Sequence, residues 1–475
     1  MYRLICICII CLGLLVLTNT TYASELLSIE EAINMAIANN PTIKAFEEEV
    51  YGKEMDRRSS IANMLPKINL TYGYARLKEA PSFDLPAQSE AWLPVVNEQK
   101  SYYFNEDDSS DPKNNIVFDP ATGKPALAYI PPTPAQELEV GTKDNYDFTI
   151  EATQPIFTGG ALWHSYKIAK SDVEVASIDK QKAIRELKLN VIETYYSLIE
   201  AKEFYEVAES GISSIKAHLN TAQAFYGQGM IPKNDLLEVQ VRYAQAKQNL
   251  IMAENGVKLT ESSLNLLLAR NLSTPIIIGG EIPMEPLFNS LNVCTDKALG
   301  NRQELRGLRL QLGMSKRGEK IARSVFVPSV AANYKYERTG EDPDVEDETW
   351  TAGIGLSWSL FEGGSHYWQL SKARSKITQL NHLIRAQRNQ ISLEVKSAYL
   401  SAEEAFARTK VATQAIDQAK ENLRIQGDRY NLQVVTSTEV LDAQALLDQA
   451  KKNYISARAD YAKDIAKLSA AMGIL

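Results

Sequence analysis

Cysteine is scarce in this sequence. The chain has 475 residues and four cysteines, and three of these, Cys6, Cys8 and Cys11, stand together near its start. Only Cys294 is left in the rest of the chain, so no disulfide can form there. An isolated cysteine is most often an apolar packing residue. The fold therefore has to be stable without disulfide bonds.

Motifs for catalysis, metal binding and nucleotide binding are missing as well. The sequence has no HExxH pair, no cysteines at zinc-ligand spacing and no GxxxxGK[ST] loop. The four histidines are scattered along the chain: His164, His218, His366 and His382. Active sites usually lie on loops, and the one long loop predicted below carries no catalytic constellation. We therefore expect no enzymatic activity, no metal and no cofactor.

Positive charge is limited too. The net charge is −8, and no concentrated basic face is visible along the sequence. Binding to nucleic acid phosphates requires such a face, so nucleic acid is excluded as the main partner.

Long apolar runs occur only at the N-terminus. Arg3 precedes an apolar stretch over residues 4–17, and Thr21-Tyr22-Ala23 forms a plausible cleavage site before Ser24. This pattern predicts a signal peptide over residues 1–23 and an exported protein. The stretch is too short for a comfortable membrane-spanning helix, and no later stretch reaches about 18 consecutive apolar residues.

What the sequence does contain is a repeat that covers nearly the whole chain after residue 23. At an offset of 204, the segment QPIFTGG at 154–160 matches WSLFEGG at 358–364, and the match continues without a gap for more than a hundred residues. Further upstream the offset becomes 262. The matched pairs include Pro66 with Pro328, Tyr74 with Tyr336, Tyr195 with Tyr399, and Tyr226 with Tyr430. One unit is therefore written twice, with an insertion of 58 residues in the first copy.

Each copy contains segments in which apolar and small polar residues alternate. INLTYGYARL at 68–77 and YDFTIEATQ at 146–154 alternate in the first copy, and WTAGIGLSWSL at 350–360 alternates in the second. Period-two alternation over nine or more residues predicts strands of the length that crosses a membrane at a tilt. A soluble hairpin with one face on a core is the alternative. No other strands are predicted that could complete a sandwich, and the Trp- and Tyr-rich face favours lipid.

Very long helices follow the strands. From Leu187 to Tyr226, and again from Ile391 to Tyr430, apolar residues recur in steps of three and four, which predicts coiled-coil packing of long helices. Each copy is then a β-hairpin joined to a tall helical hairpin. The predicted bounds are 24–271 for the first copy (β-hairpin 67–157 with a polar loop at 77–145, helical hairpin 159–271, tip 227–235), 272–290 for a linker, and 291–475 for the second copy (β-hairpin 328–361, helical hairpin 363–475, tip 431–439).

The helix breaks at the two tips carry turn and capping residues. Gly227 and Gly229 can adopt the left-handed conformation that ends a helix, and Pro232 suits the first turn of the next one. In the second tip, Thr436 and Glu439 have capping-box spacing. Acidic residues follow each break: Asp235 and Glu238 in the first copy, and Glu439 and Asp442 in the second. Two explanations of these acids are open. Each acid could stabilise the dipole of its helix by about 0.3–1 kcal/mol, or the acids of several copies could form a ring that selects cations.

Taken together, the duplicated unit, the prolines at 66 and 328, the FxGG corners and the two tips resemble the TolC-type outer-membrane efflux protein family. The resemblance implies a mainly α-helical fold with a small β part, in which a homotrimer forms a twelve-stranded outer-membrane β-barrel on a periplasmic α-helical barrel. It implies a conduit without catalysis that lies in outer-membrane lipid. The tips would dock onto a periplasmic adaptor protein and, through it, connect with an inner-membrane transporter.

The same resemblance assigns roles to tip residues. It places adaptor docking at Gln228, Gly229 and Met230 in the first tip and at Gln433 and Val434 in the second. Tyr430 and Asp235 match a gating network, and Glu439 and Asp442 match an acidic ring at the periplasmic entrance. Gln433 and Val435 stand where the family often has Gly and Arg, so we expect a closed tip held by other contacts.

Two functions follow. The first is an outer-membrane exit duct for efflux or type I secretion, and the second is a soluble periplasmic coiled-coil scaffold or adaptor. An adaptor should have one helical hairpin flanked by lipoyl-like β segments, which differs from the duplicated hairpin found here. The sequence leaves open whether drugs, metal ions or polypeptides are exported.

Overall fold

The computed structural model describes residues 26–89, 91–94, 121, 124, 127–130, 132–279, 282, 284–286, 289–344 and 347–475. The predicted signal peptide, residues 1–23, lies outside the described residues. The chain divides into two compact units. A helical unit comprises the described parts of Met1–Ala62, Gly159–Phe326 and Leu360–Leu475, and a strand unit comprises those of Asn63–Thr158 and Val327–Ser359.

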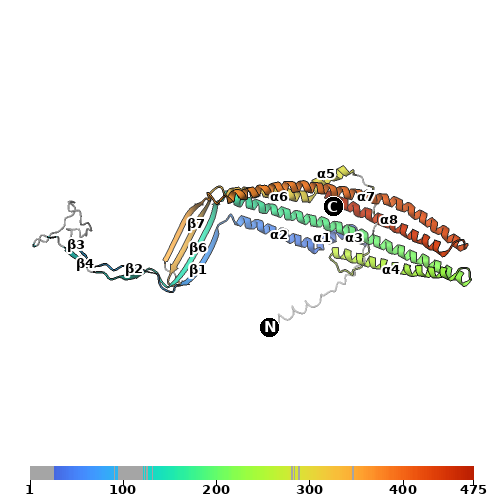
Figure 1. The fold of residues 1–475 in the computed structure, drawn as a ribbon, viewed down its shortest axis with the longest axis horizontal. Helices are drawn as coiled ribbons and strands as arrows, with labels where there is room; N and C mark the ends of the chain where they lie inside the picture. Colours follow the sequence, from blue (N-terminus) through green and yellow to red (C-terminus); the bar gives the residue numbers. More distant parts are fainter. Residues whose placement is uncertain are drawn as a thin grey trace, which may run out of the picture. The chain divides into compact units, whose positions relative to one another are not determined.

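Four long helices dominate the helical unit (Figure 1). They are α3 (Ala161–Gly227), α4 (Lys233–Leu267), α7 (Ser365–Asn431) and α8 (Ser437–Met472). The helices α3 and α7 have 67 residues each, which corresponds to about 100 Å. The predicted three-and-four spacing explains their burial, because Val191, Leu198 and Val395 are all fully buried in the seams between helices.

Four shorter helices, which the sequence analysis did not predict, complete this unit. They are α1 (Ile29–Asn39), α2 (Pro41–Ala62), α5 (Leu291–Asn301) and α6 (Gln303–Ser324). The two copies use them in the same way. Ala32 and Ala36 of α1 pack on Leu187 and Val191. In the second copy Cys294 and Ala298 of α5 pack on Ile391 and Val395, which stand 204 residues after Leu187 and Val191.

Cys294 has the packing role that the sequence predicted. Its side chain is 1% exposed in a cluster with Leu305 and Leu468, and burial raises the pKa of its thiol. No described helix is both long enough and apolar enough to cross a membrane.

The predicted strands form one sheet in the order β1-β6-β7-β8. Its antiparallel strands are β1 (Lys67–Arg76), β6 (Asp144–Phe157), β7 (Ser329–Gly340) and β8 (Asp347–Ser357). The sequence predicted two separate hairpins, and pairing of β6 with β7 joins them. The apolar residues of the alternating pattern are open to solvent in the single chain, since Leu70 is 65% exposed and Ile354 is 75% exposed.

The insertion in the first copy is more than the predicted polar loop. Within 77–145 the structure describes two short antiparallel strand pairs. One joins β2 (Ser82–Leu85) to β5 (Gln136–Glu139), and the other joins β3 (Ala91–Pro94) to β4 (Leu127–Ile130). Period-two alternation is too short in these four-residue segments to signal strands in the sequence.

Candidate functional site

The first tip is the turn between α3 and α4. Gly229 has a φ of 74°, and its N–H donates to the carbonyl of Tyr226 at 2.9 Å. The N–H of Met230 donates to the carbonyl of Phe225, also at 2.9 Å. These two bonds close the end of α3 with a left-handed residue, for which glycine is best suited. Gly227 is the last residue of α3 and does not have a positive φ, so only Gly229 has the predicted left-handed role.

The second tip repeats this backbone with a different residue. Gln433, which stands 204 residues after Gly229, has a φ of 54°. Its N–H donates to Tyr430 and the N–H of Val434 donates to Arg429, both at 2.9 Å. The turn is therefore the same as at Gly229, although a residue with a Cβ pays a steric cost in this conformation.

The acids in the first turns of α4 and α8 make different contacts. Glu439 forms the predicted capping box, accepting a bond from the N–H of Thr436 at 3.0 Å, and the hydroxyl of Thr436 lowers its pKa. Asp235 accepts a bond from the side chain of its neighbour Asn234 at 2.9 Å. Glu439 is thus engaged in capping its own helix, as the helix-end interpretation proposes.

Tyr430 does not face solvent in the single chain. Its side chain is 3% exposed, and its ring lies 4.6 Å from that of His218 and 5.7 Å from that of Phe225, measured between centroids. Its hydroxyl accepts a bond from Ser437 at 3.1 Å. Tyr430 therefore packs the end of α7 against α3 and the start of α8.

Two side-chain contacts join α4 to α8 near the tips, and neither was predicted from the sequence. Arg242 of α4 lies 3.5 Å from Asp442 of α8, measured from Nη2 to Oδ1. The hydroxyl of Thr438 donates to Glu238 at 3.0 Å. Glu238 and Asp442 occupy matching positions of the repeat, so each copy offers its second acid to the other copy. An arginine does hold an acid at this tip, but it comes from α4 and not from position 435.

The predicted docking residues lie on the outside of the two turns. Met230 is 47% exposed and Val434 is 64% exposed, while Gln228, Gly229 and Gln433 are also exposed. The single chain therefore leaves an apolar side chain uncovered at each turn.

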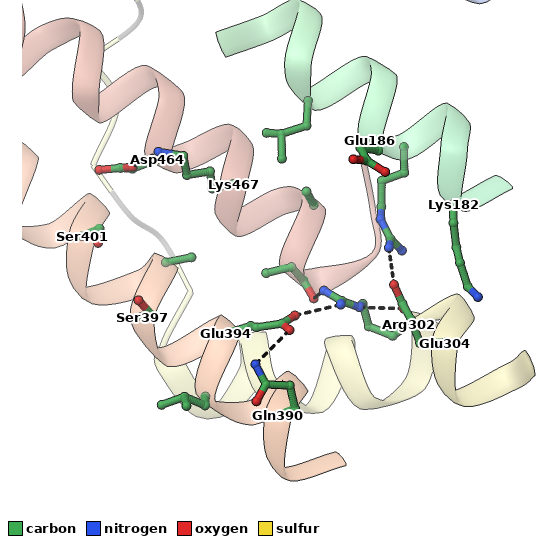
Figure 2. Close-up of a pocket in the computed structure, with 16 residues that line it drawn as sticks. Lys182, Glu186, Arg302, Glu304, Gln390, Glu394, Ser397, Ser401, Asp464 and Lys467 are labelled. Atoms are coloured by element: carbon green, nitrogen blue, oxygen red, sulfur yellow. Dashed lines mark hydrogen bonds and ion pairs between the residues drawn. The ribbon is translucent and has the colours of Figure 1, made fainter. Parts of the chain in front are cut away.

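A second candidate is a hollow of about 820 Å³ among α3, α6, α7 and α8. Figure 2 shows Arg302 lying between Glu304 of α6 and Glu394 of α7. Its Nε is 2.9 Å from Glu304, its two Nη atoms reach Glu394 at 2.8 Å and the carbonyl of Ala471 at 3.3 Å, and its side chain is 9% exposed. Arg302 therefore ties the end of α8 to both neighbouring helices.

Arg185 extends this network to α3 by contacts with Glu304 and Gln303. Burial raises the pKa of Glu304, but its own backbone N–H, Arg185 and Arg302 outweigh this and hold the pKa below its ordinary value. The charged side chains that line the hollow are balanced: Lys182, Arg185, Arg302 and Lys467 against Glu186, Glu304, Glu394 and Asp464. Such a network satisfies its own charges, which makes it a structural junction.

No group of three or more His, Cys, Asp or Glu side chains within the described ranges is placed to hold a metal. The tips are therefore the candidate functional site, because they combine exposed apolar turns with acids held across the repeat.

Comparison with known proteins relates this architecture to one family. The sequence model described as outer membrane efflux protein matches residues 32–270 and 294–474. The alkaline protease secretion protein AprF of Pseudomonas aeruginosa is 22% identical over 342 residues, covering 70% of each chain. The outer membrane protein TolC of Escherichia coli is 20% identical over 351 residues, covering 69% of each. The CmeC outer membrane channel of Campylobacter jejuni superposes with a TM-score of 0.71 at 15% identity, covering 94% of this chain and 85% of that one.

Proposed function

This chain belongs to the outer membrane efflux protein family, and from that membership we propose that three copies of it assemble into one continuous duct. The family consists of channel and transport proteins, and its members of the TolC type are homotrimers that work with adaptor proteins. The chain functions as the outer-membrane exit duct of an efflux or type I secretion system. The proposals below concern how its own residues assemble, dock and restrict passage.

The observation that carries assembly is the exposed apolar face of the four-stranded sheet. Among the described residues β1 pairs only with β6, and β8 pairs only with β7, so both edges are open. Exposed apolar residues on this sheet include Ile68, Leu70, Trp350, Ile354 and Leu356. Four strands cannot close a barrel, whereas twelve strands from three copies can, with the apolar side chains turned toward outer-membrane lipid.

The helical unit also has an apolar face that the single chain leaves exposed, on α4. Met252, Leu259 and Leu266 of α4 follow one another at intervals of seven residues and are 65–66% exposed. A heptad stripe of this kind packs against another helix in assembled coiled coils. A neighbouring copy of the chain is the partner that covers it in the proposed trimer.

At the tips we assign adaptor docking to Gln228, Gly229, Met230, Gln433 and Val434, with the inner-membrane transporter connected through the adaptor. For the entrance, we assign Asp442 to its lining, because its side chain is 60% exposed. Asp235 and Glu439 contribute negative charge beside it. Tyr430, being buried, acts by positioning α7 against α8. The links Arg242–Asp442 and Thr438–Glu238 then hold the two hairpins together.

Conductance in planar lipid bilayers tests this assignment. Wild-type protein should form trimers that conduct poorly, and Asp442→Ala should raise the conductance because it releases Arg242. The matched control is Glu254→Ala, which breaks the exposed Lys258–Glu254 pair (2.7 Å) within α4 and should leave conductance unchanged. Equal conductance of wild type and Asp442→Ala would exclude the link from the gate. Unchanged conductance after Asp235→Lys would likewise remove Asp235 from it.

Fractionation separates the duct from a soluble scaffold. A duct should be recovered with outer membranes and need detergent for release. Recovery in the periplasmic fraction without detergent would contradict the proposed assembly.

A further inference from the structure

Helix α6 carries a row of cations along one side. Arg306, Arg309, Lys316, Lys320 and Arg323 follow one another at intervals of three, seven, four and three residues. These intervals return to the same side of an α-helix. All five side chains are exposed. The row runs for about 25 Å at 1.5 Å per residue.

Helix α7 adds a second row beside the first. Arg374, Arg385 and Arg388 are separated by eleven and three residues, and all three are exposed. Arg374 reaches Glu319 of α6 at 3.2 Å, which places the start of this row next to α6. From 365 to 393, helix α7 contains no acidic residue. We call these eight cations of α6 and α7 the basic stripe.

Most of the basic stripe is not neutralised within the chain. Glu319 contacts Arg323 and Arg374. The other six cations have no ion-pair partner in the described part of the chain: Arg306, Arg309, Lys316, Lys320, Arg385 and Arg388. One cation of the stripe, Lys320, also lies close enough to His164 to affect its pKa. Burial lowers the pKa of His164, and the charges of Lys320 and Arg317 lower it further.

The stripe lies on the face of the helices that also carries α5. Helix α5 packs on Leu305 and Ile391. Arg309 follows Leu305 by one helical turn, and Arg388 precedes Ile391 by one turn, so the two rows continue the surface on which α5 lies. Helix α6 packs between α3 and α7, so its outward side is not an edge at which a neighbouring copy would join.

In the proposed trimer this face is the outside of the duct. Twelve helices about 10 Å apart enclose a lumen roughly 28 Å wide. Three copies of both α1 and α5 would obstruct such a lumen if they lay inside it. The outer surface has no such limit, so the basic stripe faces away from the transported substrate.

The first copy of the repeat does not share this feature. At the eight matching positions it has three cations, two acids and three uncharged residues: Lys44, Glu47, Glu54, Arg58, Ile61, Lys170, Gln181 and Ile184. Its acids are paired, Glu47 with Lys180 at 2.8 Å and Glu54 with Arg57. The expectation that the chain has no concentrated basic face is therefore wrong for α6 and α7. The cations are spread over two distant segments and gather only in the folded chain.

We propose that the basic stripe binds the anionic glycopeptide polymer of the cell wall, through the free carboxylates of its peptide stems. This inference rests on the proposed function, and on the expectation that the helical barrel of such a duct lies in the periplasm. Lipid headgroups are the other abundant anions there, but a headgroup layer is only about 5–8 Å deep. A row of about 25 Å along the helix axis is matched by an extended polymer.

Co-sedimentation with purified cell-wall sacculi tests the proposal, using the full-length protein in zwitterionic nanodiscs. The double variant Arg309→Glu/Lys316→Glu installs the acids found at the matching positions of the first copy. The control variant Lys216→Glu/Lys420→Glu reverses two exposed cations elsewhere on α3 and α7. We expect wild type and control to bind at low salt and to dissociate as salt is added. The double variant should bind at least tenfold more weakly, and amidation of the sacculus carboxylates should abolish binding of the wild type.

Equal binding of the double variant and the wild type would overturn the proposal. So would binding to vesicles containing phosphatidylglycerol without binding to sacculi. Bilayer conductance and mass of the same preparations keep this result separate from the proposed function. A trimer that conducts but does not bind sacculi contradicts only the proposed role of the basic stripe. Protein that forms no conducting trimer contradicts the proposed duct.

Discussion

The break between α1 and α2 and the break between α5 and α6 stand at matching positions of the repeat, yet different residues hold them. Asn40 donates from its amide to the carbonyl of Leu267 at 3.3 Å, at the end of α4. Arg302 donates to the carbonyl of Ala471 at 3.3 Å, at the end of α8, and also binds Glu304 and Glu394. In both copies a side chain therefore donates to a carbonyl at the end of the last long helix, α4 or α8. Only the second copy adds ion pairs to this contact.

This difference recurs along the second copy. A left-handed glutamine replaces the glycine of the first tip, and eight cations replace the mixed charges of α2 and α3. The two copies therefore keep the same backbone positions, whereas their side chains differ wherever several residue types satisfy the same backbone. Three sets of substitutions test this difference between the copies.

The largest effect is expected at Arg302. Arg302→Ala removes the cation that Glu304 and Glu394 share, although Glu304 keeps its contact with Arg185. It should lower the free energy of unfolding by about 3 kcal/mol, near the lower limit for breaking a buried pair because Glu394 is 37% exposed. Asn40→Ala removes two neutral hydrogen bonds, the one to Leu267 and the one that its Oδ1 accepts from the N–H of Thr42 at 2.9 Å, and should cost about 1–2 kcal/mol. Thermal unfolding followed by helical circular dichroism measures both. Arg302→Asn should fall between them, and equal losses for Arg302→Ala and Asn40→Ala would show that the charges add nothing.

The next effect concerns the left-handed residue of each tip. Gly229→Gln should destabilise the protein by about 1–2 kcal/mol, since nothing crowds the site and only the backbone conformation opposes a Cβ. Gln433→Gly should stabilise it by up to about 1 kcal/mol. Gly227→Ala, at a helical position with equal space, should be neutral or stabilising. The same thermal assay applies, and a loss on Gln433→Gly would refute the shared turn.

The smallest expected effect is a dependence of the free energy of unfolding on pH, caused by His218. Burial lowers the pKa of His218 below 6.5, and its Nε2 has no hydrogen-bond partner among the described residues. The unfolded chain therefore takes up the proton more readily, so the free energy of unfolding should decrease as pH falls below about 6.5. His218→Asn introduces the residue found at the matching position, Asn422. The variant should lose less stability than wild type between pH 8 and pH 5, and identical pH profiles would contradict this role.

Much of the tips could be predicted from the sequence. The left-handed Gly229, the capping box of Thr436 and Glu439, and the acids after each break are local features, because each depends on residues within one or two turns. The sequence missed Arg242 as the partner of Asp442 because the two are 200 residues apart. The repeat offset was the one available sign that Asp442 has a special position, since it aligns Asp442 with Glu238 as equivalent acids.

The duplication, the long helices, the alternating strands and the family could all be inferred from the sequence, because periodicity and repetition are properties of the chain alone. The contacts between the two copies became visible only in the folded chain. The pairing of β6 with β7, the network around Arg302 and the basic stripe all join segments that lie far apart in sequence. Contacts of this kind depend on which helix faces and strand edges come together, and no local pattern encodes that choice.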